Sequence, residues 1–486
     1  MISFTLSLVA LFLGYMLYGR FVERVFRPDD RVTPAVAKAD GIDYIVLPNW
    51  KIFMIQFLNI AGTGPIFGAI MGAKFGPVAY LWIVLGCIFG GATHDYLSGM
   101  LSMRNGGAGM PQLIGKYLGK TTKNLMLVAT VVLLVMVGTV FVYSPAEILH
   151  SIGGDTMMWV FLIFFYYIIA TMLPIDKIIG KVYPLFAFSL LFMAAALMVV
   201  LFIRWYELPE LWSHFYNMGA EAQPEKWTDN IFPALFITIA CGAISGFHAT
   251  QSPLMARCVK SERIGRPIFY GAMITEGLVA LIWASVASWF FYGSPAPGYE
   301  LIAGAEKGFY TSAPAVVSLV CNDWLGVAGA ILAMLGVVAA PITSGDTAFR
   351  SGRLIVADWL KLDQRPIIKR LYICIPMFIG SILMLIWQIE NPDGFNTIWQ
   401  YFGLSNQALS VFTLWAITVY LVREHKPFVI TLIPALFMTT VCSTFLFVSK
   451  QAFGLPGEIG YPLGVICLVI ACVWFAIWYK KEKSKQ

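Results

Sequence analysis

Long runs of apolar residues recur along the whole chain, and they constrain its fold more than any other feature. A helix rises 1.5 Å per residue, so about twenty residues span the ~30 Å hydrocarbon core of a bilayer. Runs of this length follow one another at short intervals from the first residues to the last. Only 12% of the residues are charged, about half of the share that hydrates the surface of a soluble domain. The chain is therefore predicted to be an all-α integral membrane protein.

The apolar runs divide into about thirteen predicted membrane spans. Their ranges are 2–19, 51–73, 76–103, 124–147, 156–174, 184–204, 230–256, 267–291, 323–345, 370–389, 396–422, 427–448 and 461–479. The first run lacks a basic stretch before it and a small-residue cleavage motif after it, so we interpret it as a span rather than a signal peptide.

Lysine and arginine residues alternate between the two sides of the predicted membrane. Loops rich in these residues remain in the cytoplasm, and one side holds all but five of the 33 basic residues. The five exceptions are Lys74, Arg204, Lys226, Lys307 and Lys450. The long loop 205–229 on the poorer side is acidic instead. This pattern predicts an N-terminus outside the cell and a C-terminus in the cytoplasm.

Two predicted spans contain glycine and proline at mid-membrane. The second holds the run Asn59-Ile-Ala-Gly-Thr-Gly-Pro-Ile-Phe-Gly68, and the seventh holds Ala240-Cys-Gly-Ala-Ile-Ser-Gly-Phe-His248. Glycine and proline weaken a helix interior by about 1 and 3 kcal/mol relative to alanine. Unwound backbone at membrane depth persists only where protein or a water-filled cavity satisfies it. Small residues also serve ordinary helix packing, so each run alone leaves that alternative open.

The spacing of the two runs favours helix breaks. They lie five spans apart, so they cross the membrane in opposite directions, as in two inverted five-helix repeats around a midplane site. We therefore predict an inverted 5+5 core made of residues 51–204 and 230–422. Residues 1–50 precede this core, the acidic loop 205–229 joins its halves, and residues 423–486 add two helices and a basic tail.

Ionisable residues inside spans are candidates for function, because a charge in the bilayer is costly. They are His94 and Asp95 in the third span, His248 in the seventh and Glu276 in the eighth. His94 and Asp95 are neighbours on a helix, about 100° apart, so we expect them not to face each other. Histidine titrates near neutral pH, which makes these residues candidates for proton coupling; hydrogen-bonded structural pairs are the alternative.

A second polar group, Thr343, Ser344 and Asp346, is expected where the ninth span meets the cytoplasm. Hydroxyl and carboxylate oxygens are hard ligands that suit a small cation. Backbone carbonyls freed by the break in the second span could complete such a site. The alternative is a helix-end cap in which Asp346 pairs with Arg350 four residues later.

Enzyme motifs are weak in this chain. Ser245 lies in Gly242-Ala-Ile-Ser-Gly246, which does not fit the G-x-S-x-G elbow, and no H-E-x-x-H motif occurs. An intramembrane hydrolase that uses Ser245 is therefore a minor alternative. The eight cysteines form no C-x-x-C pair and are interpreted as packing residues. Asn406 and Gln407 in the eleventh span are expected to link helices.

Several motifs resemble those of the carbon starvation protein A family. They are Gly64-Pro-Ile-Phe-Gly-Ala69, His94-Asp95, Cys241-Gly-Ala-Ile-Ser-Gly-Phe-His248 and Thr343-Ser-Gly-Asp-Thr-Ala-Phe-Arg350. The resemblance runs from about residue 40 to 410, and the chain is shorter than the longer members. It implies an inner-membrane transporter with a LeuT-type fold of the amino acid-polyamine-organocation superfamily. Members of the family are described as peptide transporters, and some relatives as proton-coupled pyruvate transporters.

The resemblance also implies which residues would bind a coupling ion. The sodium site of the superfamily lies between the first and eighth core helices, which implies Thr343 and Ser344 as ligands; sodium and proton both stay open as coupling ions. Amides freed near the breaks would hold a substrate carboxylate, because half-helix N-termini favour negative charge. The expected binding residues are Asn59, Gly62, Thr63, Gly64, Pro65, Gly242, Ser245, Gly246, Phe247 and His248.

We therefore expect a cation-coupled symporter that imports a short peptide or pyruvate and needs no cofactor. Its expected partners are this substrate and membrane lipid, and no nucleic-acid motif occurs in the sequence. A membrane-embedded nutrient sensor that binds the same ligand without transporting it is the alternative.

Overall fold

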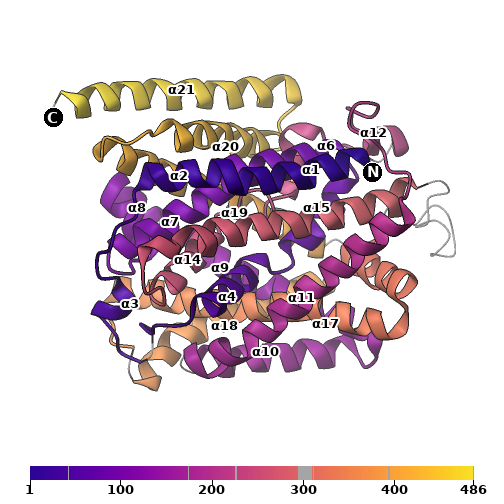
Figure 1. The fold of residues 1–486 in the computed structure, drawn as a ribbon, viewed down its shortest axis with the longest axis horizontal. Helices are drawn as coiled ribbons and strands as arrows, with labels where there is room; N and C mark the ends of the chain where they lie inside the picture. Colours follow the sequence, from indigo (N-terminus) through magenta and orange to yellow (C-terminus); the bar gives the residue numbers. More distant parts are fainter. Residues whose placement is uncertain are drawn as a thin grey trace.

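The structure, a computed structural model, describes residues 1–41, 43–172, 175–224, 227–293, 309, 311–364, 366–391 and 394–484. Within these ranges the chain is a bundle of helices that lie side by side (Figure 1). The loop charges Glu225, Lys226, Lys307, Arg365 and Lys485 of the predicted topology lie outside the described residues.

The helices up to residue 204 include three π-helical segments, which are given as η. They are α1 (Ile2–Leu13), η1 (Gly14–Tyr18), α2 (Gly19–Phe26), α3 (Pro34–Ala37), α4 (Asn49–Ala61), η2 (Gly64–Gly68), α5 (Ala69–Ala73), α6 (Val78–Leu81), η3 (Trp82–Gly91), α7 (Ala92–Arg104), α8 (Met110–Leu118), α9 (Lys120–Ile152), α10 (Thr156–Met172) and α11 (Ile175–Arg204).

In the second half two further η segments are π-helical, whereas the three-residue segment Glu262–Ile264 is a 3-10 helix. Its helices are α12 (Met218–Ala222), η4 (Ile231–Leu235), α13 (Phe236–Thr238), α14 (His248–Ala256), η5 (Glu262–Ile264), η6 (Arg266–Tyr270), α15 (Gly271–Tyr292), α17 (Ala313–Leu360), α18 (Ile367–Glu390), α19 (Gly394–Arg423), α20 (Val429–Val448) and α21 (Gly457–Lys483).

Many of these helices are long and apolar enough to cross a bilayer, so the chain is a multi-pass membrane protein. Ten helices meet that test in the described part of the chain, or eleven if the bent pair Asn49–Ala61 and Gly64–Ala73 is one span. The predicted span 156–174 corresponds to the shorter helix α10, and residues 173–174 lie outside the described ranges. The predicted span 230–256 is divided into short pieces. The total of thirteen crossings therefore stays a prediction.

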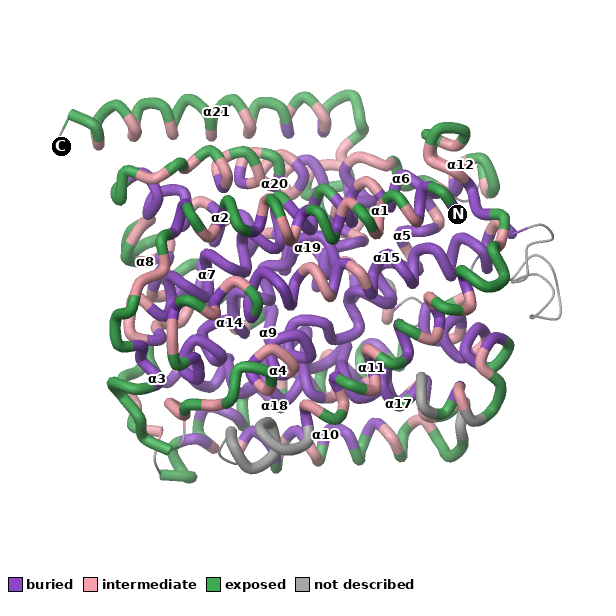
Figure 2. The backbone as a smooth tube through the Cα atoms, in the orientation of Figure 1, coloured by how far each residue is buried: buried purple, intermediate pink, exposed green. Residues whose placement is uncertain are grey.

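Burial differs strongly between the helices. The most apolar windows of Val78–Arg104 and Glu262–Tyr292 are each 83% buried, whereas that of Gly457–Lys483 is 11% buried. Figure 2 shows the same gradient, with a buried centre and an exposed α21 that lies on α20 at one edge. The interior helices are thus those that carry the predicted ionisable residues.

The central helices pack as two groups. In one group α9, α10, α17 and α18 contact one another around a cluster of buried aromatic rings that includes Tyr167, Phe349 and Phe378. In the other group α7 packs on α14, and α15 packs on α4, η2 and α5. The groups meet where α4 contacts α17, which is also where the first of the two broken segments lies.

The two chain ends lie at opposite ends of the bundle (Figure 1). The backbone N–H groups of Ile2 and Ser3 donate to Glu210 at 2.8 and 2.7 Å, so the acidic loop shares the end of the N-terminus. Burial opposes the ionisation of Glu210, but hydrogen bonds from the terminal ammonium group, Ser3 and Ile2 outweigh it and lower its pKa to about 2.

Candidate functional site

Helical backbone stops and resumes within the second predicted span. α4 ends at Ala61, η2 begins at Gly64, and the two pieces are bent by 52°. Gly62 between them has a φ of 48°, which glycine adopts without the steric penalty of other residues. A β carbon on Gly62 would lie 2.7 Å from the ring of Phe141. Both the backbone and the space around it therefore require glycine at this position.

The seventh predicted span has a longer interruption. α13 ends at Thr238, α14 begins at His248, and the nine residues between them are not helical. Gly242 within this stretch has a φ of 90°, and a β carbon on it would lie 2.5 Å from the β carbon of Ala280. The glycines that predicted this interruption thus also allow α15 to approach it closely.

Side chains from neighbouring helices satisfy the backbone of this second interruption. Trp82 Nε1 donates to the carbonyl oxygen of Ile239 at 2.9 Å. The N–H of Phe247 donates to Asn406 Oδ1 at 2.6 Å, and the hydroxyl of Ser245 donates to the same oxygen at 3.0 Å. Asn406, expected to link helices, therefore holds the unwound segment against α19. Ser245 bonds an amide, so it is not paired as the nucleophile of a hydrolase would be.

The two interrupted segments cross in direct contact. A β carbon on Gly64 would lie 2.2 Å from the β carbon of Cys241, and one on Gly68 would lie 2.9 Å from the carbonyl oxygen of Thr238. Atoms that are not bonded to each other do not approach this closely, so a side chain at either glycine would clash with the second segment. Gly64 and Gly68 therefore bring the first segment against the backbone of the second.

Polar side chains beside the first interruption are buried without partners. Gln56, Asn59 and Thr63 are each 0% exposed, and within the described part of the chain their side-chain nitrogen and oxygen atoms have no hydrogen-bond partner. Ser344 Oγ, in contrast, donates to the carbonyl oxygens of Leu58 and Asn59, at 3.1 Å each. Buried polar groups in native proteins are normally satisfied, so this region has binding capacity for a ligand, an ion or water.

The four ionisable residues of the predicted proton pathway lie together. Asp95 Oδ2 is 2.8 Å from His248 Nδ1, and His248 Nε2 is 3.3 Å from Glu276 Oε2. His94 Nδ1 is 2.7 Å from Asp95 Oδ1. The expectation that His94 and Asp95 do not face each other is therefore wrong. Their Cβ atoms diverge, but Nδ1 lies close to its own backbone and the short carboxylate has two oxygens, so one oxygen reaches His94 while the other reaches His248.

The thiol of Cys241 belongs to the same cluster. The Cys241 Sγ atom, a ring nitrogen of His248 and a carboxylate oxygen of Glu276 all lie within 4.8 Å of one another. Asn406 Nδ2 is 3.7 Å from this sulfur atom. From the sequence alone, Cys241 is interpreted as a packing residue. The available signal was its position in the glycine-rich run that ends at His248.

The predicted cation ligands lie deeper than expected. The corresponding apolar helix is Gly329–Leu360, so Ser344 lies near its middle rather than at the cytoplasmic end of a span 323–345. In the sequence, Arg350 and Arg353 indicated the end of a span. In the structure both residues lie within α17, and both side chains are buried. Arg350 donates to the carbonyl oxygen of Ala170 at 2.7 Å, and Arg353 donates to Gln364 at 3.1 Å. These contacts keep the guanidinium groups inside the protein.

The three candidate cation ligands also differ in their contacts. Ser344 reaches the first interruption, as described above, whereas the Thr343 hydroxyl donates to Ala340 in its own helix at 2.8 Å. Asp346 accepts a hydrogen bond from the Tyr183 hydroxyl at 2.7 Å and lies 4.0 Å from Arg350. Residues two apart on a helix do not face each other. The structure thus brings Ser344 to the freed carbonyls and directs Asp346 elsewhere.

A charged network lies at the end of the bundle that holds the C-terminus. Arg104, at the end of α7, binds Glu262 through two nitrogens at 3.1 and 3.0 Å. Arg31 lies 3.6 Å from Glu262 and hydrogen-bonds Asp29, which holds the pKa of the Asp29 carboxyl well below its usual range. The network joins the segment after α2 to α7 and η5.

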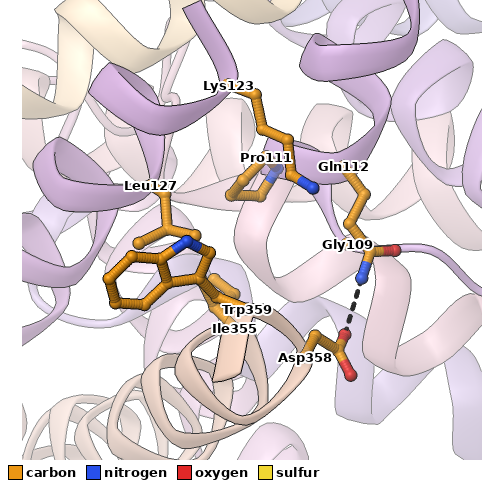
Figure 3. Close-up of a pocket in the computed structure, with 8 residues that line it drawn as sticks. All are labelled: Gly109, Pro111, Gln112, Lys123, Leu127, Ile355, Asp358 and Trp359. Carbon is orange, nitrogen blue, oxygen red and sulfur yellow. Dashed lines mark hydrogen bonds between the residues drawn. The ribbon is translucent and has the colours of Figure 1, made fainter. Parts of the chain in front are cut away.

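Of two hollows on the described part of the molecule, neither is lined by Asp95, His248 or Glu276. Figure 3 shows the smaller, beside a hydrogen bond of 2.9 Å from Gln112 to Asp358. Its volume of about 20 Å³ suffices for little more than one water molecule. The larger, of about 460 Å³, is an apolar groove between η3, α13 and α20, with Trp82 and Phe437 in its wall.

Known proteins are similar to this chain in sequence, and others are similar to it in fold. A "Peptide transporter CstA" of Bacillus subtilis is 26% identical over 97% of this chain and 94% of its own length. An "Uncharacterized membrane protein" of Haemophilus influenzae is 44% identical over 63% of this chain and 95% of its own length.

Solved structures of transporters match at lower identity. A Na⁺-coupled sialic acid symporter has a TM-score of 0.55 at 15% identity, over 97% of this chain and 98% of its own. A variant of the Eremococcus coleocola manganese transporter has a TM-score of 0.57 at 11% identity, over 92% and 99%. The chain therefore has the fold of these transporters. The family model described as "Carbon starvation protein CstA" matches residues 1–152, 142–296 and 300–445, so this chain belongs to the carbon starvation protein CstA family.

Proposed function

We propose that this chain is a secondary active transporter, a cation-coupled symporter that imports a small carboxylate-bearing nutrient. The observation that carries the proposal is the contact of the two interrupted segments beside buried polar side chains that lack partners. Paired broken helices at a repeat interface are where secondary transporters bind substrate and ion. Relatives named peptide transporters, and a fold shared with transporters, support the same function.

The substrate is proposed to bind at the first interruption, in contact with the second. Asn59 and Thr63 supply donors and acceptors that the described chain does not use. Helical segments begin at Gly64 and at His248, and helix N-termini favour a carboxylate. Of the expected amides, the N–H groups of Ile66, Phe67, Ala243, Ile244 and Phe247 already donate within the protein. A short peptide or pyruvate carries such a group, and both are included in the proposal.

Two arrangements support two coupling ions. The Ser344 hydroxyl and the carbonyl oxygens of Leu58 and Asn59 form a group of hard oxygen atoms that suits Na⁺. The buried chain His94, Asp95, His248 and Glu276 suits proton transfer, because each member can take up or release a proton and neighbouring members lie within 2.7 to 3.3 Å of each other. Asp346, bonded to Tyr183, is the weakest of the proposed cation ligands.

Alternating access is proposed to occur between the two packing groups. α4 to α7, α14 and α15 would move as one unit against α9, α10, α17 and α18, because each group packs mainly on itself. The location proposed for this movement is the bacterial inner membrane, with the C-terminus in the cytoplasm. The apolar groove beside Trp82 and Phe437 is proposed to contact lipid.

Uptake by the purified chain in proteoliposomes tests the proposal. Labelled pyruvate and a labelled dipeptide are supplied while a sodium gradient and a proton gradient are imposed separately. We expect accumulation of one substrate above its outside concentration under one gradient. Substrate binding in detergent without uptake would favour the sensor, and uptake of neither substrate with no binding would reject the symporter.

A further inference from the structure

We propose that Cys241, His248 and Glu276 bind a thiophilic divalent cation such as Zn²⁺. These residues supply a thiolate, an imidazole nitrogen and a carboxylate, which are the three ligand types of protein zinc sites. Their exposed fractions are 3%, 0% and 0%, and their ligand atoms lie within 4.8 Å of one another.

The separation of His248 Nε2 and Glu276 Oε2 is that of two ligands of one metal ion. His248 Nε2 lies 3.3 Å from Glu276 Oε2, yet in the described part of the chain neither atom has a hydrogen-bond partner of acceptable geometry, nor does Glu276 Oε1. Two ligands bound tetrahedrally to Zn²⁺ at about 2.0–2.3 Å are themselves separated by about 3.3–3.8 Å. A small contraction around an ion would therefore satisfy all three side chains at once.

The surroundings also orient the ligands as in known metal sites. Asp95 Oδ2 accepts from His248 Nδ1 at 2.8 Å, which leaves Nε2 free to bind and is the carboxylate–histidine–metal arrangement. Asn406 Nδ2 approaches the Cys241 sulfur at 3.7 Å, where an amide would stabilise a thiolate. A protonated His248 is the alternative to a metal ion, because it would pair with both Asp95 and Glu276, while the Cys241 thiol lies 3.6 Å from the Ser245 hydroxyl.

Charge supports a divalent rather than a monovalent ion. Binding would release the thiol proton to solvent, and the resulting thiolate with the Glu276 carboxylate would balance two positive charges in a buried region. The ligands come from the second interruption, from the start of α14 and from α15. A bound ion would therefore tie these elements together, and, resting on the proposed function, we expect it to inhibit transport reversibly.

Cobalt gives a direct readout, because tetrahedral Co²⁺ bound to thiolate absorbs visible light and shows a thiolate-to-metal charge-transfer band. The full chain, with any affinity tag removed, is titrated with Co²⁺ in detergent and is also purified from cobalt-supplemented cells. We expect one Co²⁺ per chain with both spectral features, and displacement of Co²⁺ by Zn²⁺. Absence of the charge-transfer band in both preparations would overturn the proposal.

Matched variants assign the ligands. Cys241→Ser should abolish the charge-transfer band, whereas Cys258→Ser, which alters a buried thiol that donates to the carbonyl oxygen of Leu254, should leave it unchanged. Asp95→Asn should weaken Co²⁺ binding by about 10–100-fold through the ligand it orients. A band that survives Cys241→Ser contradicts the assignment.

X-ray absorption of the zinc-loaded wild type requires no variant. It should show one sulfur ligand at about 2.3 Å, and a spectrum with only nitrogen and oxygen ligands contradicts the site. Cobalt binding without uptake would reject the transport proposal alone, and uptake without cobalt binding would reject the metal site alone.

Discussion

The two interrupted segments differ in how their backbone groups and the polar side chains beside them are hydrogen-bonded. The first is short, and its freed carbonyls at residues 58 and 59 contact one hydroxyl, while the amides of Gln56 and Asn59 have no partner in the described chain. The second is longer, and Trp82 and Asn406 bond its backbone from both sides. The first segment therefore retains binding capacity, whereas the second is fixed by the protein itself.

This difference separates two tasks that a transporter must perform. A fixed segment holds charged groups at constant distances, which suits the cluster of Asp95, His248 and Glu276. A segment with unsatisfied polar groups gains most from a ligand, because the ligand removes the cost of burying them. The following substitutions test whether the segments divide the work in this way.

The largest effect is expected from Asp95→Asn, which removes the charge between His94 and His248. Loss of one partner of a buried charged pair costs about 3–5 kcal/mol, which changes an equilibrium constant by a factor of more than about 100. Gradient-driven accumulation in proteoliposomes should disappear, while exchange of labelled for unlabelled substrate persists. Ser98→Ala on the same helix, which removes a hydrogen bond to the backbone carbonyl of Asp95 and leaves the carboxylate in place, serves as the control. Full accumulation by Asp95→Asn would exclude the cluster from coupling.

Asn406→Leu should mainly affect stability, because it leaves the N–H of Phe247 and the hydroxyl of Ser245 without an acceptor. Each buried donor left unsatisfied costs about 1–3 kcal/mol. Thermal unfolding in detergent should therefore occur at a clearly lower temperature than in the wild type. Thr413→Val on α19, whose hydroxyl bonds its own helix, should change the temperature little. An unchanged Asn406→Leu protein would mean that the second segment is not fixed by this contact.

Asn59→Leu should give the opposite result. Its amide has no partner within the described residues, so an apolar residue of similar volume should preserve or raise the unfolding temperature. Substrate affinity should fall about tenfold, which corresponds to about 1.4 kcal/mol and one lost hydrogen bond. Binding and unfolding measured on the same preparation separate the two effects. Destabilisation as large as that of Asn406→Leu would erase the contrast between the segments.

Ser344→Ala should produce the smallest of these changes. It removes one hydroxyl from the freed carbonyls, a contact worth about 1 kcal/mol, so the sodium concentration for half-maximal uptake should rise about fivefold. Thr347→Val, which alters a hydroxyl bonded to its own helix, is the matched control. A response equal to that of the control would favour protons as the coupling ion.

The helix interruptions could be predicted because their cause is local. Glycine at residue 62 and in the run 240–248 determines the backbone conformation where it stands, and the structure interrupts the helices there. The separation of five spans predicts that the two runs cross in opposite directions, and this prediction depends only on the order of the chain. The residue types in each run and the order of the runs along the chain are both given by the sequence.

Contacts between residues far apart in the sequence could not be predicted in this way. Cys241 and Glu276 lie 35 positions apart in the sequence, and no spacing rule brings their atoms together. Arg350 and Arg353 resembled the charged end of a span, because the sequence does not indicate that their guanidinium groups find acceptors inside the protein. Helix geometry alone predicted that His94 and Asp95 do not face each other. Their side chains are nevertheless long enough to form a contact of 2.7 Å.

The close crossing at Gly64 makes Cys241 a natural reporter of molecular motion. The β carbon and sulfur of Cys241 occupy the space that a side chain on Gly64 would fill, at 2.2 and 2.4 Å from its ideal β-carbon position. No alkylating reagent has room at this sulfur while the segments touch. The rate at which maleimide modifies Cys241, in a chain whose other cysteines are serine, therefore measures how often the segments part. Substrate and ion gradients can be ranked by how much each changes that rate.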